Sequence, residues 1–218
     1  ICLIPKPKGG DRPIGLLPAL YAWVIKCWSQ QLTEWDEALE AHWDTAIKGS
    51  SALQAALRRR LRDEVSLLDG KETGAIHWDM EKFYDSIDLE YLCLWATELK
   101  FDPVIMLIGL SVHCAPRHIR VGPFIGKAKP VTNSVIAGCS LAVKWSKIML
   151  YHTLQKVHSQ IPVEIQSFYD DIVVRSVSSE LGTIVERLLE CSTLMVKLLK
   201  GAKLNFSEKK TTITISDF

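Results

Sequence analysis

The stretch SFYDDIVVRS, Ser167–Ser176, places two adjacent aspartates between aromatic and β-branched residues. Such neighbours favour a β-strand, and a carboxylate is costly inside a buried strand. Two interpretations are open. In the first, Asp170 and Asp171 form the solvent-exposed turn of a hairpin, because aspartate is common in turns. In the second, the hairpin presents two carboxylates as ligands for divalent cations.

The pattern on either side predicts an α+β protein in which strands and helices alternate irregularly. The segment RRRLR should lie on the outer side of its helix, and Trp23, Trp28 and Trp35 should pack in the core. We expect a hairpin within residues 1–17, helices near 18–40, 51–68, 89–100, 140–158 and 178–200, and a further helix that begins at residue 103. We also expect a strand near 74–79, strands and turns over 117–135, a hairpin over 163–176, and a turn and strand over 202–215.

Composition narrows the functional classes. The chain has 218 residues, of which 48% are hydrophobic and 23% charged, and its net charge is +1. A uniformly basic nucleic-acid binder is excluded, but a basic groove beside an acidic centre is not. No run of about 18 apolar residues occurs, so we expect no membrane partner. The six cysteines form no C-x-x-C pair, which favours reduced thiols in an intracellular protein.

Three aspartates fall at the predicted ends of strands. Asp79 ends the strand GAIHW, and Asp170 and Asp171 lie at the hairpin tip. If the two strands are neighbours in one sheet, the three carboxylates converge and repel each other unless a cation lies between them. Hard oxygen ligands suit Mg²⁺. Two such ions about 4 Å apart could activate a 3′-hydroxyl and stabilise a leaving pyrophosphate.

These residues belong to a longer series of motifs, which resembles the fingers and palm of a reverse transcriptase of the retroelement or group II intron type. The motifs occur in the family's order and cover nearly the whole chain. They are IPKPKGGDRPIGLL, DMEKFYDSID, NSVIAGCSLA, FYDD and GAKLNFSEKKT. The resemblance implies a right-hand polymerase fold with an antiparallel palm sheet backed by helices.

The resemblance also implies a domain layout and metal ligands. Part of the fingers would span 1–71, the palm 72–100 and 134–218, and a fingers or palm insertion 101–133, with the thumb outside this segment of a longer protein. Asp79, the Met80 carbonyl, Asp170 and Asp171 would bind two Mg²⁺ ions, with Mn²⁺ as a substitute. Lys210, or its neighbour Lys209, would lie near the leaving phosphate.

A further set of residues would bind the nucleotide. Lys6 or Lys8, together with Arg12, would neutralise triphosphate oxygens. Tyr84 resembles a steric gate that excludes the 2′-hydroxyl, and Gly138 keeps a close backbone approach. Ala137 stands where the family usually has a glutamine. Asp85 has either a structural or a metal-supporting role, and we favour the structural one.

The expected function is therefore template-directed synthesis of DNA on an RNA or DNA template from dNTPs, for a retroelement. The expected partners are an RNA template, a DNA primer and dNTPs. Two alternatives remain open at this point. One is a decayed copy that keeps the fold and nucleic-acid binding without catalysis. The other is an RNA-dependent RNA polymerase, although Tyr84 and the Tyr169-Asp170-Asp171 box favour deoxynucleotides.

Overall fold

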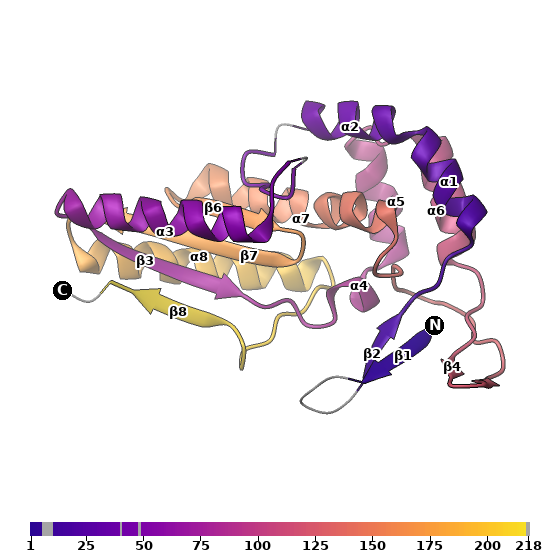
Figure 1. Cartoon of the computed structure of the whole chain (residues 1–218). Helices are drawn as coiled ribbons and strands as arrows, with labels where there is room; N and C mark the ends of the chain where they lie inside the picture. Colours follow the sequence, from indigo (N-terminus) through magenta and orange to yellow (C-terminus); the bar gives the residue numbers. More distant parts are fainter. Residues whose placement is uncertain (6–10, 40, 48, 217–218) are drawn as a thin grey trace. The chain divides into compact units, whose positions relative to one another are not determined.

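The computed structural model describes residues 1–5, 11–39, 41–47 and 49–216 (Figure 1). The chain forms two compact units. The first combines Ile1–Glu40 with Tyr84–Met149, and the second combines Ala41–Phe83 with Leu150–Phe218. The domain bounds expected from the sequence differ from these units and stay a prediction.

The second unit is built on a four-stranded antiparallel sheet in the order β6-β7-β3-β8. The register pairs Trp78 of β3 with Ile172 of β7. β-branched residues fill β7, and its middle is buried on both faces. The strands are β3 (Glu72–Trp78), β6 (Glu164–Phe168), β7 (Asp171–Ser178) and β8 (Thr212–Ile215).

Helices cover both faces of this sheet (Figure 1). Helix α8 (Leu181–Gly201) packs closely on one face, where a Cβ added at Gly74 would come within 2.6 Å of Ile184. Helix α3 (Ala52–Leu68) lies on the other face and begins at the N-cap Ser51. The buried Arg175 fixes α3, because its guanidinium donates to Asp63 at 2.5 Å. The sheet and its strand ends are thus held rigidly from both sides.

The first unit is mainly helical. Its core includes Ile25, Leu92, Ile105 and Trp145, all at most 2% exposed. Its helices are α1 (Ala19–Cys27), α2 (Ser29–Ala38), α4 (Phe83–Ser86, at the unit boundary), α5 (Leu89–Glu98), α6 (Pro103–His113) and the first half of α7 (Ser140–Gln160). Its sheet has the order β2-β1-β4-β5, formed by β1 (Cys2–Pro5), β2 (Asp11–Ile14), β4 (Arg120–Val121) and β5 (Phe124–Ile125).

The α+β class and most predicted elements are confirmed, and the Asp88 and Asp102 side chains cap the N-termini of α5 and α6. Two expectations are wrong. The helix near 18–40 is broken at Trp28, whose N–H bonds Ile25 O in a tighter turn. Trp23 is 71% exposed and not in the core.

The segment RRRLR lies on the outer side of α3 as expected, since Arg58, Arg60, Leu61 and Arg62 are exposed, with the exception of Arg59, which lines a cavity between α3 and the sheet. Within the described residues, no helix is long and apolar enough to cross a membrane.

Candidate active site

Asp79 follows directly after β3, at the edge where β7 begins. The register that pairs Trp78 with Ile172 places Asp79 next to Asp171 on the neighbouring strand. A second segment fixes the backbone here, because Ser207 N–H donates to Asp79 O at 2.7 Å. Lys210 lies on the same segment, and its Nζ is 3.2 Å from Asp79 Oδ1. Asp79 is therefore held from its own strand and from the chain before β8.

Asp170 and Asp171 occupy the tip of the β6–β7 hairpin. Phe168 pairs with Asp171, so that Tyr169 and Asp170 form the turn. Tyr169 has φ +59°, a left-handed conformation that non-glycine residues seldom adopt. Its ring also contacts Phe168 edge-on, with 4.7 Å between ring centroids. Residues Ser167–Ser176 thus form a tight hairpin that carries Asp170 in the turn and Asp171 at the start of β7.

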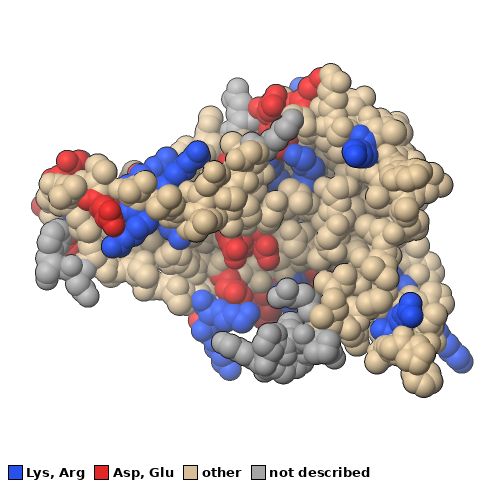
Figure 2. All heavy atoms as spheres, in the orientation of Figure 1, with Lys and Arg blue, Asp and Glu red and all other residues tan. Residues whose placement is uncertain are grey.

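The three carboxylates act on each other electrostatically. Burial raises the pKa of Asp170 above its ordinary value, the neighbouring charges of Asp171 and Asp79 raise it further, and a hydrogen bond to its own backbone opposes the rise. Figure 2 shows acidic atoms gathered at this edge of the sheet. Burying several like charges together is costly unless a cation or a proton compensates them.

The donor set fits a hard divalent cation such as Mg²⁺, which takes carboxylate and carbonyl oxygens. In the described parts of the chain, no three His, Cys, Asp or Glu side chains form a ready-made metal cluster. The Lys210 ammonium instead compensates part of the charge at Asp79. Met80 sits beside Asp79 and forms an isolated bridge with Phe206, so its backbone is fixed too.

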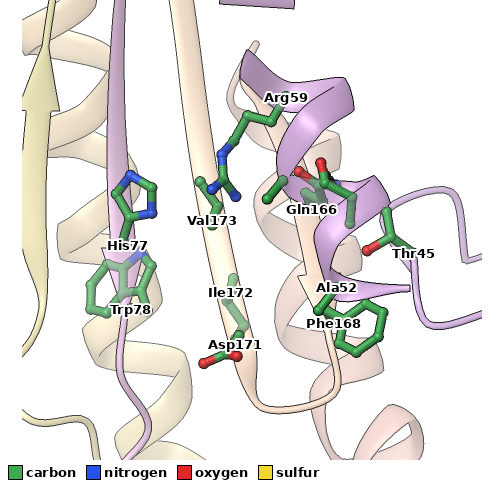
Figure 3. A pocket seen from close by; sticks show the side chains of 12 residues that line it. Thr45, Ala52, Arg59, His77, Trp78, Gln166, Phe168, Asp171, Ile172 and Val173 are labelled. Atoms are coloured by element: carbon green, nitrogen blue, oxygen red, sulfur yellow. Dashed lines mark hydrogen bonds between the residues drawn. The ribbon is translucent and has the colours of Figure 1, made fainter. Parts of the chain in front are cut away.

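A cavity of about 270 Å³ opens beside Asp171, between α3 and the sheet. Figure 3 shows the Arg59 side chain reaching from α3 over β7 toward Val173, with His77 on the neighbouring strand. Burial lowers the pKa of His77, the charge of Arg59 lowers it further, and Asp63 opposes both. His77 is therefore neutral near pH 7, and Arg59 supplies the positive charge of this cavity.

The first unit gathers a different group of predicted site residues. The Tyr84 carbonyl accepts from Val135 N–H at 2.8 Å, which ties α4 to the loop that carries Ala137 and Gly138. Both loop residues are exposed, and Gly138 has φ +91°, where a side chain is strained. The loop is also anchored to helix α6, because Ile136 N–H donates to Nδ1 of the buried His113 at 2.9 Å.

A second cavity, of about 570 Å³, lies beside this loop. Its wall includes Leu16, Leu17 and Gly138, so the segment after β2 and the glycine loop share one opening. Gly15 approaches Ile136 so closely that any Cβ would overlap it. The sequence motifs around residues 15 and 138, far apart in the chain, thus pack against each other.

The structure sorts the predicted site residues into two groups. The second unit brings together Asp79, Met80, Asp170, Asp171 and Lys210, and the first unit brings together Tyr84, Ala137 and Gly138. Lys209 is exposed in the same turn as Lys210. Lys6 and Lys8 lie outside the described residues, and Arg12 is described only as a β2 residue that pairs with Ile4.

Sequence reasoning missed two residues that border these groups, His113 beside the glycine loop and Arg59 in the cavity beside Asp171. His113 belongs to no motif, and only its place in an otherwise apolar helix sets it apart. Arg59 was expected to face solvent with the other residues of RRRLR. Leucines recur every four residues in the same helix, on the side opposite to Arg59.

Known structures share this fold at low sequence identity. Apo telomerase from Candida tropicalis, truncated from its C-terminal domain, matches with 15% identity and a TM-score of 0.69 over 99% of this chain and 49% of that chain. The C. tropicalis telomerase in complex with a fragment of telomeric RNA matches with 13% identity and a TM-score of 0.65, over 99% and 40%.

The corresponding complex from Candida albicans matches with 15% identity and a TM-score of 0.61, over 88% and 34%. The chain thus spans half or less of these proteins, and they establish its fold only. No curated protein sequence matches it significantly.

A family model supplies the stronger comparison. The model of the reverse transcriptase (RNA-dependent DNA polymerase) family matches residues 4–217. This range contains both groups of site residues and all five sequence motifs. The resemblance inferred from those motifs is confirmed, and the chain belongs to the reverse transcriptase family.

Proposed function

We propose that this chain carries the fingers and palm of an RNA-directed DNA polymerase, which extends a DNA primer on an RNA or DNA template from dNTPs, for a retroelement. One observation carries the proposal. The β3–β7 register places Asp79 beside Asp171, and Asp170 precedes Asp171 in the hairpin turn, where burial first and then the charges of Asp171 and Asp79 raise the pKa of Asp170. Family membership supports polymerase chemistry for such a group.

The aspartates and the Met80 carbonyl would hold two Mg²⁺ ions, or Mn²⁺ in their place. When bound, such ions favour ionisation of a primer 3′-hydroxyl and stabilise the leaving pyrophosphate. The chain itself supplies rigidity, because the tight hairpin and the Ser207–Asp79 hydrogen bond fix the ligands before substrate arrives. Lys210 would move from Asp79 toward the pyrophosphate and neutralise its charge.

The nucleotide would be bound by residues of the first unit. Lys6, Lys8 and Arg12 would contact the triphosphate, and Tyr84 would pack under the sugar. The loop at Ala137 and Gly138 is exposed and borders the larger cavity, which supports a role in placing the base pair that forms. Two of the similar telomerase structures contain a fragment of telomeric RNA, which supports RNA as a binding partner. The proposed location is intracellular.

A decayed copy without catalysis is the second candidate. It is favoured by Ala137, an exposed alanine where the family usually has a nucleotide-contacting glutamine. An RNA-dependent RNA polymerase ranks third, because Tyr84 replaces the aspartate that would hold a 2′-hydroxyl.

Primer extension on an RNA template tests the proposal in the full-length protein. We expect extension with Mg²⁺ or Mn²⁺, and none with a chelator. Asp170→Asn should abolish extension but keep the fold, since one charged ligand is lost. Asp69→Asn, at the exposed C-terminal cap of α3, is the matched control and should extend normally. Normal extension by Asp170→Asn would contradict the site assignment, and an inactive but template-binding parent would favour the decayed copy.

A further inference from the structure

Helix α3 presents small and polar residues to the sheet and apolar residues to solvent, which is the reverse of an ordinary surface helix. Its sheet-facing side is small or polar, since Ala55 is buried and Asp63 and Ser66 bond the guanidinium of Arg175. Its outward side carries the apolar residues Leu53, Leu57, Leu61, Val65 and Leu68, which are 79%, 56%, 51%, 57% and 88% exposed. Amphipathic helices of folded proteins normally bury that stripe.

The orientation of α3 is fixed by buried polar contacts. Arg175 is 5% exposed and bonds Asp63 at 2.5 Å, Ser66 Oγ at 2.8 Å and Arg62 O at 3.1 Å. Gln166 of β6 also donates to Ala55 O at 3.2 Å. Rotating α3 to bury its leucines would take Asp63, Ser66 and the Arg62 carbonyl away from the buried guanidinium, which would then keep only Glu164 of β6 as a partner. The outward leucine stripe, Leu53 to Leu68, is therefore a stable property of the fold.

The shape of the leucine stripe suits another helix. Its members follow each other at intervals of four, four, four and three residues, so they form a ridge along the i, i+4 row. Such ridges pack into the grooves of a second helix. The stripe contains no aromatic residue, whereas membrane-surface helices and single-strand nucleic-acid sites commonly rely on aromatic side chains.

The borders of the leucine stripe are basic. Arg58 and Arg60 flank it, and the Arg60 side chain is 70% exposed. Glu64 pairs with Arg60 at 3.1 Å, and Asp63 is turned inward to Arg175. Figure 2 shows blue basic atoms over α3. A second copy of this chain would place arginine against arginine, which is unfavourable.

We propose that the leucine stripe is a docking surface for an amphipathic helix of a partner protein, one with an apolar ridge and acidic flanks. The partner's leucine-type side chains would fill the spaces between Leu57 and Leu61, and its carboxylates would pair with Arg58 and Arg60. The proposal does not depend on polymerase activity, because it rests on the burial and charge of α3 alone.

A designed peptide tests this surface in the full-length protein. The probe is a fluorescent helix of roughly 20 residues with a leucine ridge and glutamate flanks, and its counterpart has lysine flanks. We expect the glutamate peptide to bind at least about tenfold more tightly than the lysine peptide, with weaker binding at high salt. Arg58→Glu should reduce or reverse the difference in affinity between the glutamate peptide and the lysine peptide.

The variant Leu57→Glu with Leu61→Glu should weaken peptide binding by at least about tenfold while the melting temperature stays close to that of the parent. Leu94→Glu on α5 is the matched control, because Leu94 is 53% exposed and lies off the stripe. Equal binding of both peptides, or full binding by the double variant, would overturn the proposal. Dimers that the double variant abolishes would assign the surface to a second copy. Binding to anionic vesicles but not to the peptide would assign it to a membrane.

Discussion

Acid should destabilise this protein through His113, a fully buried histidine of α6. Its Nδ1 accepts from Ile136 N–H, and its ring packs on Trp145 with 4.8 Å between centroids. Burial, and secondarily the charge of Arg117, lowers its pKa from 6.5 to about 4. Protonation would also remove the acceptor that anchors the glycine loop. The folded protein therefore keeps His113 neutral where the unfolded chain protonates it.

The sign and the size follow from these two pKa values. Since the unfolded chain binds more protons between pH 6.5 and about 4, stability is full above pH 6.5 and falls as the pH drops. Between about pH 7.5 and pH 5, the loss from His113 alone should be about 2 kcal/mol. For a chain of this size, that lowers Tm by roughly 4 to 8 °C.

The assay is thermal unfolding of the parent and of His113→Gln across this pH range. Glutamine does not titrate, and its amide oxygen can accept from Ile136 N–H. His77 also has a lowered pKa, so both proteins keep some pH dependence from groups other than His113. The difference between their Tm values therefore isolates His113. Equal slopes of Tm against pH in parent and variant would refute the reasoning.

Two further predictions concern the first unit. Tyr84→Val should admit rNTPs while dNTP use changes much less, because a steric gate acts by repulsion. The measurement is kcat/KM for dGTP and GTP on one RNA template, and an equal loss for both nucleotides would indicate a packing role. Gly138→Ala should lower stability by about 1 to 2 kcal/mol, because φ is +91° and, among the described residues, no atom lies within 4 Å of the added Cβ to offset the strain. An unchanged urea midpoint would mean that the loop relaxes.

The catalytic edge was predictable because its signals are local. Apolar and β-branched residues indicated β3 and the hairpin, and strand pairing then determined that Asp79 and Asp171 lie side by side. Which strands are neighbours came from the resemblance to a family and not from periodicity. The short β1–β4 pairing had no such signal, since it joins Cys2 to Arg120 by a single parallel bridge.

The orientation of α3 was not predictable from arginines alone. Charged residues usually face water, so RRRLR indicated an outer face. Arg58, Arg60 and Arg62 do face solvent, but the outward leucines depend on the buried Arg175, more than a hundred residues away, which needs Asp63 and Ser66 as partners. Trp23 was misplaced for a similar reason, since helical periodicity gives the relation among side chains but not which side meets the core.

The two-residue turn at Tyr169 and Asp170 has a consequence for how this gene can vary. Phe168 pairs directly with Asp171, so an inserted codon would either carry Asp170 away from Asp79 or force a bulge into the hairpin. Deleting a codon from this segment would remove either the turn or one of the two aspartates. Related genes should therefore keep this segment constant in length, and at position 169 they should avoid β-branched residues, which tolerate positive φ least.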